Sequence, residues 1–177
     1  MEYTLTIEQI GGNAMVVPGR GFLLNNELTD FNFTPTQGSA PDPNLPAPGK
    51  RPRSSMAPTV LLSHGKPFLA TGSPGGSTII TTVFQILLNR IDLSMTLPEA
   101  IAAARASQRN TAAVVAEPEF LDSPERLALE GLGHTFSTMA EIGAATGVEF
   151  LPNGQVLAAA EPVRRGGGSA AVVRPSH

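Results

Sequence analysis

The stretch that most constrains the fold runs from Lys50 to Thr82, because it combines two short apolar runs with a glycine-rich turn. The runs Thr59–Leu62 and Phe68–Thr71 are joined by the polar segment Ser63–Lys66, and this pattern predicts a β-hairpin. The second run leads into Gly72–Ser77, after which apolar residues recur at helical spacing. The stretch therefore predicts two strands, a glycine turn and the beginning of a helix.

A turn of this kind leaves backbone N–H groups unpaired at a helix N-terminus, where anions and developing oxyanions bind. The residues alone leave three interpretations open. The turn is a plain connection without a ligand, or a phosphate-binding loop, which is disfavoured because no lysine precedes Ser77. In the third interpretation the amides of Gly75 and Gly76 form an oxyanion hole, which needs a nucleophile from elsewhere.

Further elements are expected downstream of the turn. The apolar spacing of Ser77–Asn89 predicts a helix buried on more than one side. A capping box at Thr96 and Glu99 predicts that a helix begins at Leu97 and extends to Arg105. The remaining patterns predict a helix from Ser123 to about Gly131 or Gly133 and strands at Ala113–Ala116, Thr135–Thr138, Val148–Phe150 and Gln155–Ala159, the last two forming a hairpin.

Three motifs, in this order along the chain, resemble the small subunit of the γ-glutamyltransferase (γ-glutamyltranspeptidase) family. They are Leu24–Phe31, the segment Arg51–Thr59 together with Thr71–Thr82, and Arg164–Gly168. The resemblance covers nearly the whole chain. It implies an α+β layered sandwich that forms part of the αββα fold of N-terminal-nucleophile hydrolases and is incomplete without the large subunit. Residues 1–177 are expected to form a single domain.

The resemblance also implies residue roles in acyl transfer. Gly75 and Gly76 would hold the tetrahedral oxyanion, and Thr4 would lie beside the hydroxyl of the nucleophile and orient it. The family's nucleophile is a threonine that becomes a new N-terminus when the precursor cleaves itself, with its own amine as base. No Thr-x-His segment of the kind that carries it occurs in these residues. We therefore expect no nucleophile in this chain, and no activity from the chain alone.

Substrate recognition is assigned by the same resemblance. Glu27 and Asp30 would hold the α-amino group of the γ-glutamyl moiety, and Ser54 and Ser55 its α-carboxylate. From spacing alone the two acids are also compatible with a solvated loop and a helix cap, and the serines with a simple turn. Thr6 stands where many family members carry an asparagine that helps to bind the amine.

Two segments near the N-terminus carry further expectations. Residues Tyr3–Gln9 alternate between apolar and polar, which predicts a half-buried strand. In the family this strand pairs with the strand that begins at the nucleophile. The segment Asn32–Arg53 is rich in proline and longer than an ordinary connection, so we interpret residues 32–53 as a lid-like loop over the substrate pocket.

Composition excludes several other classes of function. The chain has no cysteine, so it has neither disulfides nor a thiol nucleophile, and it fits either redox compartment. A net charge of −3 gives no argument for a nucleic-acid partner, and no apolar run is long enough to span a membrane. The histidines His64, His134 and His177 are isolated from one another, so we predict no metal site. No cofactor is implied. Localisation stays open between the periplasmic or secreted location of the family and the cytoplasm.

The expected reaction is transfer of a γ-glutamyl group, from a substrate such as glutathione, to water or to an amino-acid or peptide acceptor through an acyl-threonine intermediate. A large subunit is the expected partner. The alternative is a non-catalytic fragment, or a stand-alone binding protein, that retains the glutamyl pocket without the chemistry. An in-frame Thr-x-His segment upstream of these residues would favour the enzyme.

Overall fold

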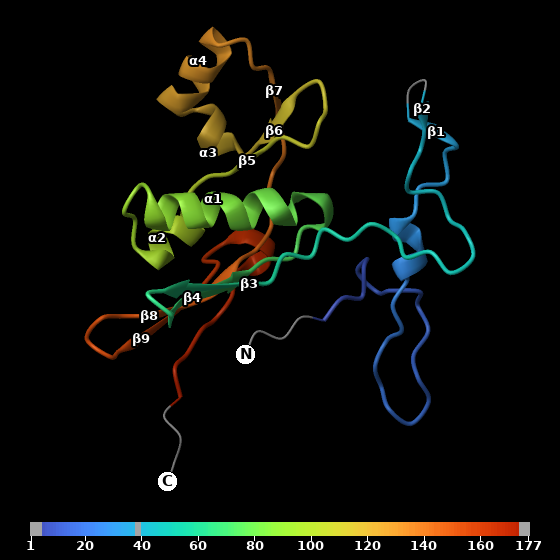
Figure 1. Ribbon diagram of the computed structural model, residues 1–177, viewed down its shortest axis with the longest axis horizontal. Coiled ribbons are helices and arrows are strands. Elements are labelled where there is room, and N and C mark those ends of the chain that lie inside the picture. The colour runs from blue at the N-terminus through green and yellow to red at the C-terminus, as the bar shows by residue number, and fades with distance from the viewer. Residues whose placement is uncertain (1–4, 38–39, 174–177) are drawn as a thin grey trace. The chain divides into compact units, whose positions relative to one another are not determined.

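The computed structural model describes residues 5–37 and 40–173. The chain divides into two compact units, Tyr3–Ser54 and the chain from Ser55 onward, which we call the N-terminal unit and the C-terminal unit (Figure 1). The expectation of a single domain over residues 1–177 stays a prediction. Among the described residues, no helix combines the length and the apolar character that crossing a membrane requires.

The main sheet of the C-terminal unit has four antiparallel strands in the order β3-β4-β8-β9. The predicted hairpin is confirmed, with β3 at Thr59–Ser63 and β4 at Lys66–Gly72. Its two-residue turn has φ of 50° at His64 and 76° at Gly65, the left-handed backbone that tight hairpin turns require. The second hairpin joins β8 (Thr146–Phe150) to β9 (Val156–Ala160), as the sequence also predicted.

Two helices cover one face of this sheet (Figure 1). They are α1 (Ile79–Ile91), preceded by the 3-10 turn η2 (Gly76–Thr78), and α2 (Leu97–Ala102). The core between helices and sheet is aliphatic and consists of Leu69, Ile86, Leu97, Ala100, Ile101, Ala145 and Ala159.

The predicted capping box of α2 is present. Thr96 Oγ1 accepts a hydrogen bond from the Glu99 N–H, and the Glu99 carboxylate accepts one from the Thr96 N–H at 2.8 Å. The helix ends at Ala102 and not at Arg105 as expected. Arg105 instead donates hydrogen bonds to two buried carboxylates, from its backbone N–H to Glu117 and from its guanidinium to Glu161. The backbone bond to Glu117 replaces the helical one.

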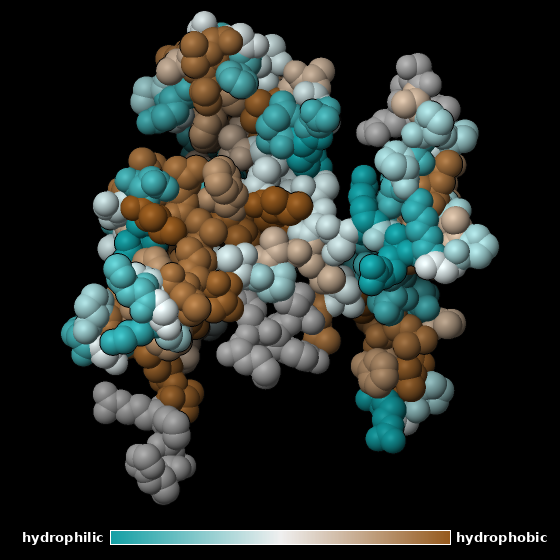
Figure 2. Space-filling model, in the orientation of Figure 1, coloured by the Kyte–Doolittle hydropathy of each residue, from teal (hydrophilic) through white to brown (hydrophobic). Residues whose placement is uncertain are grey.

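The helix α1 differs from expectation on its far side. We predicted that it is buried on more than one side, but Ile80, Phe84 and Ile91 are exposed. On the face that Figure 2 shows, hydrophobic residues gather where α1 lies in Figure 1. The prediction was wrong because helical spacing identifies apolar positions without saying whether other parts of the described chain reach them.

A smaller sheet in the C-terminal unit has the strand order β5-β6-β7. The short strand β5 (Ala106–Ser107) was not predicted; it pairs antiparallel with β6 (Val114–Ala116), and β6 pairs parallel with β7 (Phe136–Thr138). The connection from β6 to β7 holds two short helices, α3 (Pro118–Leu121) and α4 (Pro124–Gly131). The predicted helix after Ser123 is confirmed as α4, and Ser123 caps it through the Arg126 N–H.

The N-terminal unit has little regular structure. It holds the 3-10 turn η1 (Glu27–Asp30), the strands β1 (Thr36–Gln37) and β2 (Ala40–Pro41), and an isolated bridge between Val16 and Leu23. The last turn of the chain with defined structure is η3 (Arg164–Gly166), which belongs to the C-terminal unit.

The strand expected at Tyr3–Gln9 is wrong for residues 5–9, which carry no strand. Their backbone groups pair with Asn26 instead: the Asn26 N–H donates to Ile7 O at 3.2 Å, and the Gln9 N–H donates to Asn26 Oδ1 at 3.0 Å. The alternating pattern fits a pleated strand, but within the described residues no ladder forms there. Asn26 bonds to two of these groups, one through its backbone N–H and one through its side-chain oxygen.

Candidate functional site

The glycine turn lies between the end of β4 and the beginning of α1. Gly75 has φ of 145° and Gly76 has φ of 55°, conformations that favour glycine. The Gly75 carbonyl accepts hydrogen bonds from the Thr78 N–H at 3.1 Å and from Thr78 Oγ1 at 2.9 Å, which fixes the turn. Neither the Gly75 nor the Gly76 N–H donates to any residue that the structure describes. Two unpaired donors therefore precede a helix, an arrangement that can hold an oxyanion.

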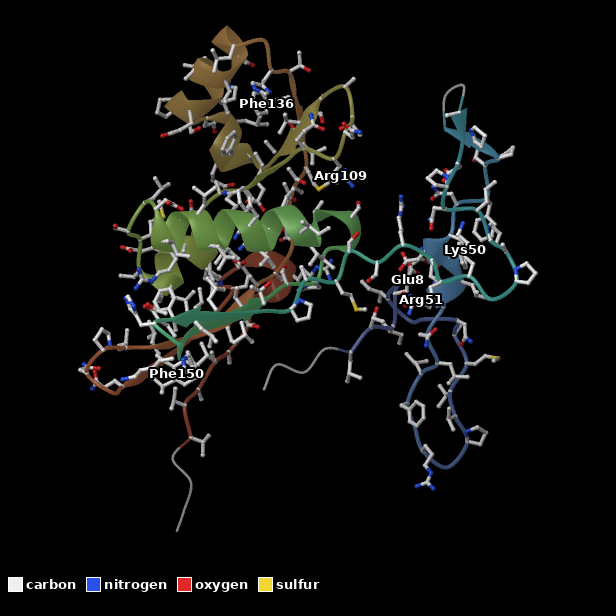
Figure 3. The ribbon with its side chains drawn as sticks, viewed as in Figure 1. Glu8, Lys50, Arg51, Arg109, Phe136 and Phe150 are labelled. Carbon is white, nitrogen blue, oxygen red and sulfur yellow. The ribbon has the colours of Figure 1, made fainter. Side chains whose placement is uncertain are left out.

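A cation lies next to the same turn. Arg109 Nη1 donates a hydrogen bond to Ser77 Oγ at 2.5 Å, and Figure 3 shows this arginine beside the start of α1. Its guanidinium adds positive charge at the helix end that already attracts anions. Sequence reasoning did not single out Arg109, because it lies in a polar loop 32 positions from its partner with no motif around it.

The two predicted acids lie together in the N-terminal unit. Glu27 and Asp30 begin and end the single 3-10 turn η1. Burial, then the proximity of Asp30, then the negative charge of Glu8 raise the pKa of Glu27 above its ordinary value. Glu27 Oε2 is buried and has no hydrogen-bond partner among the described residues. A bound ammonium group would supply the missing donor and relieve the repulsion between the carboxylates.

Short polar contacts order this acid pair. Thr29 Oγ1 donates to Glu8 Oε2 at 2.6 Å, and Asn26 Nδ2 donates to Thr29 Oγ1 at 3.0 Å. On the other side, Asn44 Nδ2 donates to the Asp30 carbonyl at 2.7 Å. Glu8 was not predicted as a site residue, since nothing in its spacing links it to Glu27.

The segment 32–53, predicted as a lid-like loop, contacts η1 through hydrogen bonds of buried polar side chains. Besides its bond to Asp30, Asn44 receives a hydrogen bond at Oδ1 from the Arg53 N–H at 2.9 Å, and its own N–H donates to Asp42 Oδ1 at 2.7 Å. Asp42 and Asn44 are both buried. The role of the segment as a lid stays a prediction.

The other predicted residues fall in three places. Thr6 Oγ1 accepts a hydrogen bond from the Glu8 N–H at 3.1 Å, which connects it to the acid region. Ser54 and Ser55 lie on the extended segment 51–58, where the chain passes from the N-terminal to the C-terminal unit. Thr4 lies outside the described residues. The convergence of the acids and serines with the glycine turn in one pocket stays a prediction.

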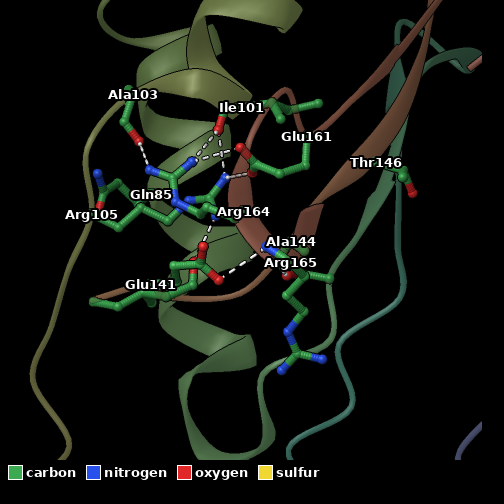
Figure 4. Close-up of polar contacts among 12 residues, drawn as sticks. Gln85, Ile101, Ala103, Arg105, Glu141, Ala144, Thr146, Glu161, Arg164 and Arg165 are labelled. Atoms are coloured by element: carbon green, nitrogen blue, oxygen red, sulfur yellow. Dashed lines mark hydrogen bonds and ion pairs between the residues drawn. The ribbon is translucent and has the colours of Figure 1, made fainter. Parts of the chain in front are cut away.

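A buried ion-pair cluster in the C-terminal unit was not predicted as a feature of the fold or the site. Its members are Arg105, Glu117, Glu161 and Arg164, all buried. Figure 4 shows Arg105, Glu161 and Arg164 close together. Arg164 contacts Glu117 through Nε and Nη2 and donates from Nη1 to Glu161 Oε1 at 2.9 Å. Arg105 Nη2 donates to Glu161 Oε2 at 3.0 Å. Two positive and two negative side chains thus neutralise one another away from water.

The ion-pair cluster shifts the ionisation of its members. Burial alone would raise the pKa of Glu117, but hydrogen bonds from Arg164 and from the Ile142 and Arg105 amides outweigh burial and lower that pKa. Burial and the like charge of Arg164 lower the pKa of Arg105. The carboxylate of Glu117 is therefore held ionised in the folded unit.

Comparison with known proteins places these features in a family. Residues 2–171 match the family described as Gamma-glutamyltranspeptidase. The glutathione hydrolase proenzyme of Bacillus subtilis (strain 168) is 38% identical over 168 residues, which are 94% of this chain and 28% of that protein. The glutathione hydrolase proenzyme of Escherichia coli (strain K12) is 36% identical over 166 residues, which are 90% of this chain and 28% of that protein.

Solved structures give the same picture. A highly active mutant of the Gamma-glutamyltranspeptidase from Pseudomonas nitroreducens matches with a TM-score of 0.82 and 32% identity, covering 98% of this chain and 92% of that chain. A mutant of the Helicobacter pylori Gamma-Glutamyltranspeptidase matches with a TM-score of 0.81 and 35% identity, covering 90% and 91%. The expected fold class, an α+β portion of an N-terminal-nucleophile hydrolase fold, is confirmed. The chain spans about 28% of the length of the two curated relatives.

Proposed function

Because the chain belongs to the γ-glutamyltranspeptidase family, a family of enzymes, we propose that it supplies the substrate-binding and oxyanion-holding part of a γ-glutamyltransferase or glutathione hydrolase. In this reaction a threonine hydroxyl from outside these residues attacks the γ-amide carbon of a donor such as glutathione. Its proton passes to the threonine's own amine and then to the leaving amine as the C–N bond breaks. Water or an acceptor amine then takes the glutamyl group from the acyl-threonine.

The observation that carries this proposal is the glycine turn. The amides of Gly75 and Gly76 have no partner among the described residues, and neither residue has a Cβ to obstruct a carbonyl oxygen. Arg109 adds positive charge beside Ser77. Such donors stabilise the negative charge that develops on a carbonyl oxygen during attack.

Donor recognition in this proposal belongs to the acids and the serines. Glu27 and Asp30 bind the α-ammonium group, whose positive charge would offset the burial and the neighbouring carboxylates that raise the pKa of Glu27. Ser54 and Ser55 bind the α-carboxylate. Thr6 supplies a hydroxyl near the acids, and Thr4 orients the nucleophile. The remaining partner is a large subunit that carries the rest of the substrate pocket.

The first experiment measures release of a chromogenic amine from a γ-glutamyl anilide. We expect no turnover by the purified 177-residue chain and turnover when it is co-expressed with a large subunit and the segment that bears the nucleophile. Turnover by the chain alone, abolished by a substitution within it, would place the nucleophile inside these residues, with Thr4 as the first candidate. Glutamate binding without turnover in the reconstituted complex would favour the alternative, a binding protein.

The second experiment tests the amine clamp in the same complex. Asp30→Ala should weaken the use of γ-glutamyl donors far more than that of glutaryl donors, which lack the α-amine. Losing a charge-assisted contact to a buried ammonium costs about 2–5 kcal/mol. The matched control is Asp122→Ala, since Asp122 is an exposed acid in the C-terminal unit. Equal losses with both donors would contradict the clamp.

A further inference from the structure

The backbone of residues 142–144 connects the ion-pair cluster to the glycine turn. Both polar groups of Ile142 are held by the cluster: its N–H donates to Glu117 Oε1 at 2.7 Å, and its carbonyl accepts from Arg105 Nη1 at 2.6 Å. The Ile142 side chain is only 1% exposed. The cluster therefore fixes the position and the orientation of this peptide.

Two residues further on, the same backbone contacts the residues that lead into the turn. The Ala144 N–H donates to Ser73 Oγ at 3.1 Å, and Ser73 Oγ donates to the Pro74 carbonyl at 2.7 Å. The Pro74 carbonyl belongs to the peptide whose N–H is that of Gly75. A bond to this carbonyl therefore sets the plane in which the Gly75 N–H points.

Contact between the two glycine segments is close. A Cβ added to Gly143 would lie 2.6 Å from Ser73 Oγ and 3.1 Å from Thr82 Oγ1, and a Cβ added to Gly75 would lie 3.5 Å from the Gly143 Cα. Gly143 has φ of 71°, which also favours glycine. The backbone at 142–144 therefore packs against the turn with no side chain between them.

We propose that Glu117 and Ser73 are positioning residues that orient the amide of Gly75 through the backbone of residues 142–144. The proposal rests on the proposed function, because it concerns the donors that hold the oxyanion. Glu117 holds Ile142, Ile142 holds the position of Gly143 and Ala144, and Ala144 holds Ser73 against the Pro74–Gly75 peptide. Neither Glu117 nor Ser73 touches the substrate in this arrangement.

A positioning role of the cluster affects the rate of acylation, whereas a purely structural role affects only the stability of the unit. Preorganised donors accelerate a reaction only when they aim at the position of the oxyanion, and a misplacement of about 1 Å can cost about 100-fold in rate. Loosening the connection should therefore alter local exchange at the turn and the acylation rate while the unit stays folded.

The first test uses amide hydrogen exchange on the 177-residue chain, read at Thr78 and Ala144, whose N–H groups donate to the Gly75 carbonyl and to Ser73 Oγ. Ser73→Ala removes the Oγ that joins Ala144 to Pro74, and Glu117→Gln keeps the size of the side chain but removes its charge. We expect at least about tenfold faster exchange at these two amides in both variants, corresponding to about 1.4 kcal/mol of local stability. Ser123→Ala is the matched control, because Ser123 also bonds to backbone groups but in the connection between α3 and α4.

The second test measures acylation in the complex with a large subunit and the nucleophile segment. Ser73→Ala should lower kcat by about ten- to 100-fold with KM little changed. If Glu117→Gln fails to fold, Ser73→Ala and Gly143→Ala still test the connection, since Gly143→Ala inserts a methyl group against Ser73. Unchanged exchange at Thr78 and Ala144 in Ser73→Ala would overturn the proposal. Altered exchange with unchanged acylation would retain the positioning but overturn the oxyanion role of the turn.

Discussion

The two units of this chain hold their shape in different ways. The C-terminal unit packs α1 and α2 on a four-stranded sheet over an aliphatic core, with a neutralised ion-pair cluster at its edge. In the N-terminal unit Phe31 is the one apolar side chain that is buried among those the structure describes, whereas Leu5, Ile10, Leu28 and Phe33 are among the exposed ones. Its order comes from side chain–backbone hydrogen bonds around Asn26, Asp42 and Asn44.

This difference matches the two tasks in the proposed function. Oxyanion donors must be aimed before the reaction, and the glycine turn belongs to the unit with the packed core. The acid pair belongs to the unit held by polar contacts, where a bound ammonium would offset the repulsion between the carboxylates. In the proposed function, rigid packing would serve the chemistry, and the less packed unit would serve recognition of the donor.

The largest effect should come from breaking the ion-pair cluster. Arg164→Ala leaves Glu117 and Glu161 buried without their shared partner, and losing one partner of a buried pair costs about 3–5 kcal/mol. Urea unfolding followed by circular dichroism would report the loss. Arg126→Ala is the control, because Arg126 pairs with Glu130 on the surface, and a pair of that kind contributes about 0.3–0.5 kcal/mol. A loss in Arg164→Ala no larger than the control would contradict the stabilising role of the cluster.

The next effect compares the two units directly. Leu69 is fully buried in the core, so Leu69→Ala should lower the free energy of unfolding by about 2–5 kcal/mol. Leu28 lies in η1 and is 73% exposed, so Leu28→Ala should change it by less than about 0.5 kcal/mol. Similar losses in the free energy of unfolding for the two variants would show that the N-terminal unit is stabilised by apolar packing as much as the C-terminal unit is. Thermal and urea unfolding of both variants would decide.

A smaller effect is expected at the start of α2. Thr96→Ala removes the hydroxyl that accepts from the Glu99 N–H, and the loss of an N-cap typically costs about 1 kcal/mol. The same substitution should raise the pKa of Glu99, which is lowered by its bonds to Thr96. Titration of the Glu99 carboxyl carbon by NMR would check the second effect. A pKa of Glu99 that does not move would contradict the capping box in solution.

The smallest effect contrasts one carboxyl group from each unit as pH changes. The pKa of Glu117 is lowered, so its contribution to stability is present above its ordinary value of 4.5 and is lost as pH falls through the lowered value. The pKa of Glu27 is raised, so its contribution is present below 4.5 and is lost as pH rises through the raised value. NMR titration of the two carboxyl carbons should give midpoints on opposite sides of 4.5. Midpoints on the same side would contradict the contrast.

Sequence patterns predicted those parts of the fold that depend on residues close together in the chain. The hairpin of β3 and β4, the capping box at Thr96 and the cap at Ser123 each depend on residues within a few positions of one another. The spacing of Glu27 and Asp30 likewise predicted that these acids lie together. The glycine turn Gly72–Ser77 predicted the unpaired amides before helix α1.

Contacts between distant positions could not be predicted in this way. Arg105 and Glu161 are 56 positions apart, and Arg164 and Glu117 are 47 apart, so no short window contains either pair. The partnership of Glu8 with Thr29 spans 21 positions. The failed strand at Tyr3–Gln9 has a related cause, since alternation describes the faces of a strand but not whether another strand pairs with it.

The order of strands in the main sheet has a consequence for how quickly the C-terminal unit folds. Each hairpin closes over a short turn, but β4 meets β8 only after the chain between them has folded back, as the bond from Thr71 Oγ1 to Thr146 O across 75 positions records. Closing so long a loop costs conformational entropy before the contacts between β4 and β8 form and stabilise it. Pairings between strands far apart in the sequence therefore slow folding. We expect both hairpins to form early and the seam between β4 and β8 to set the overall rate.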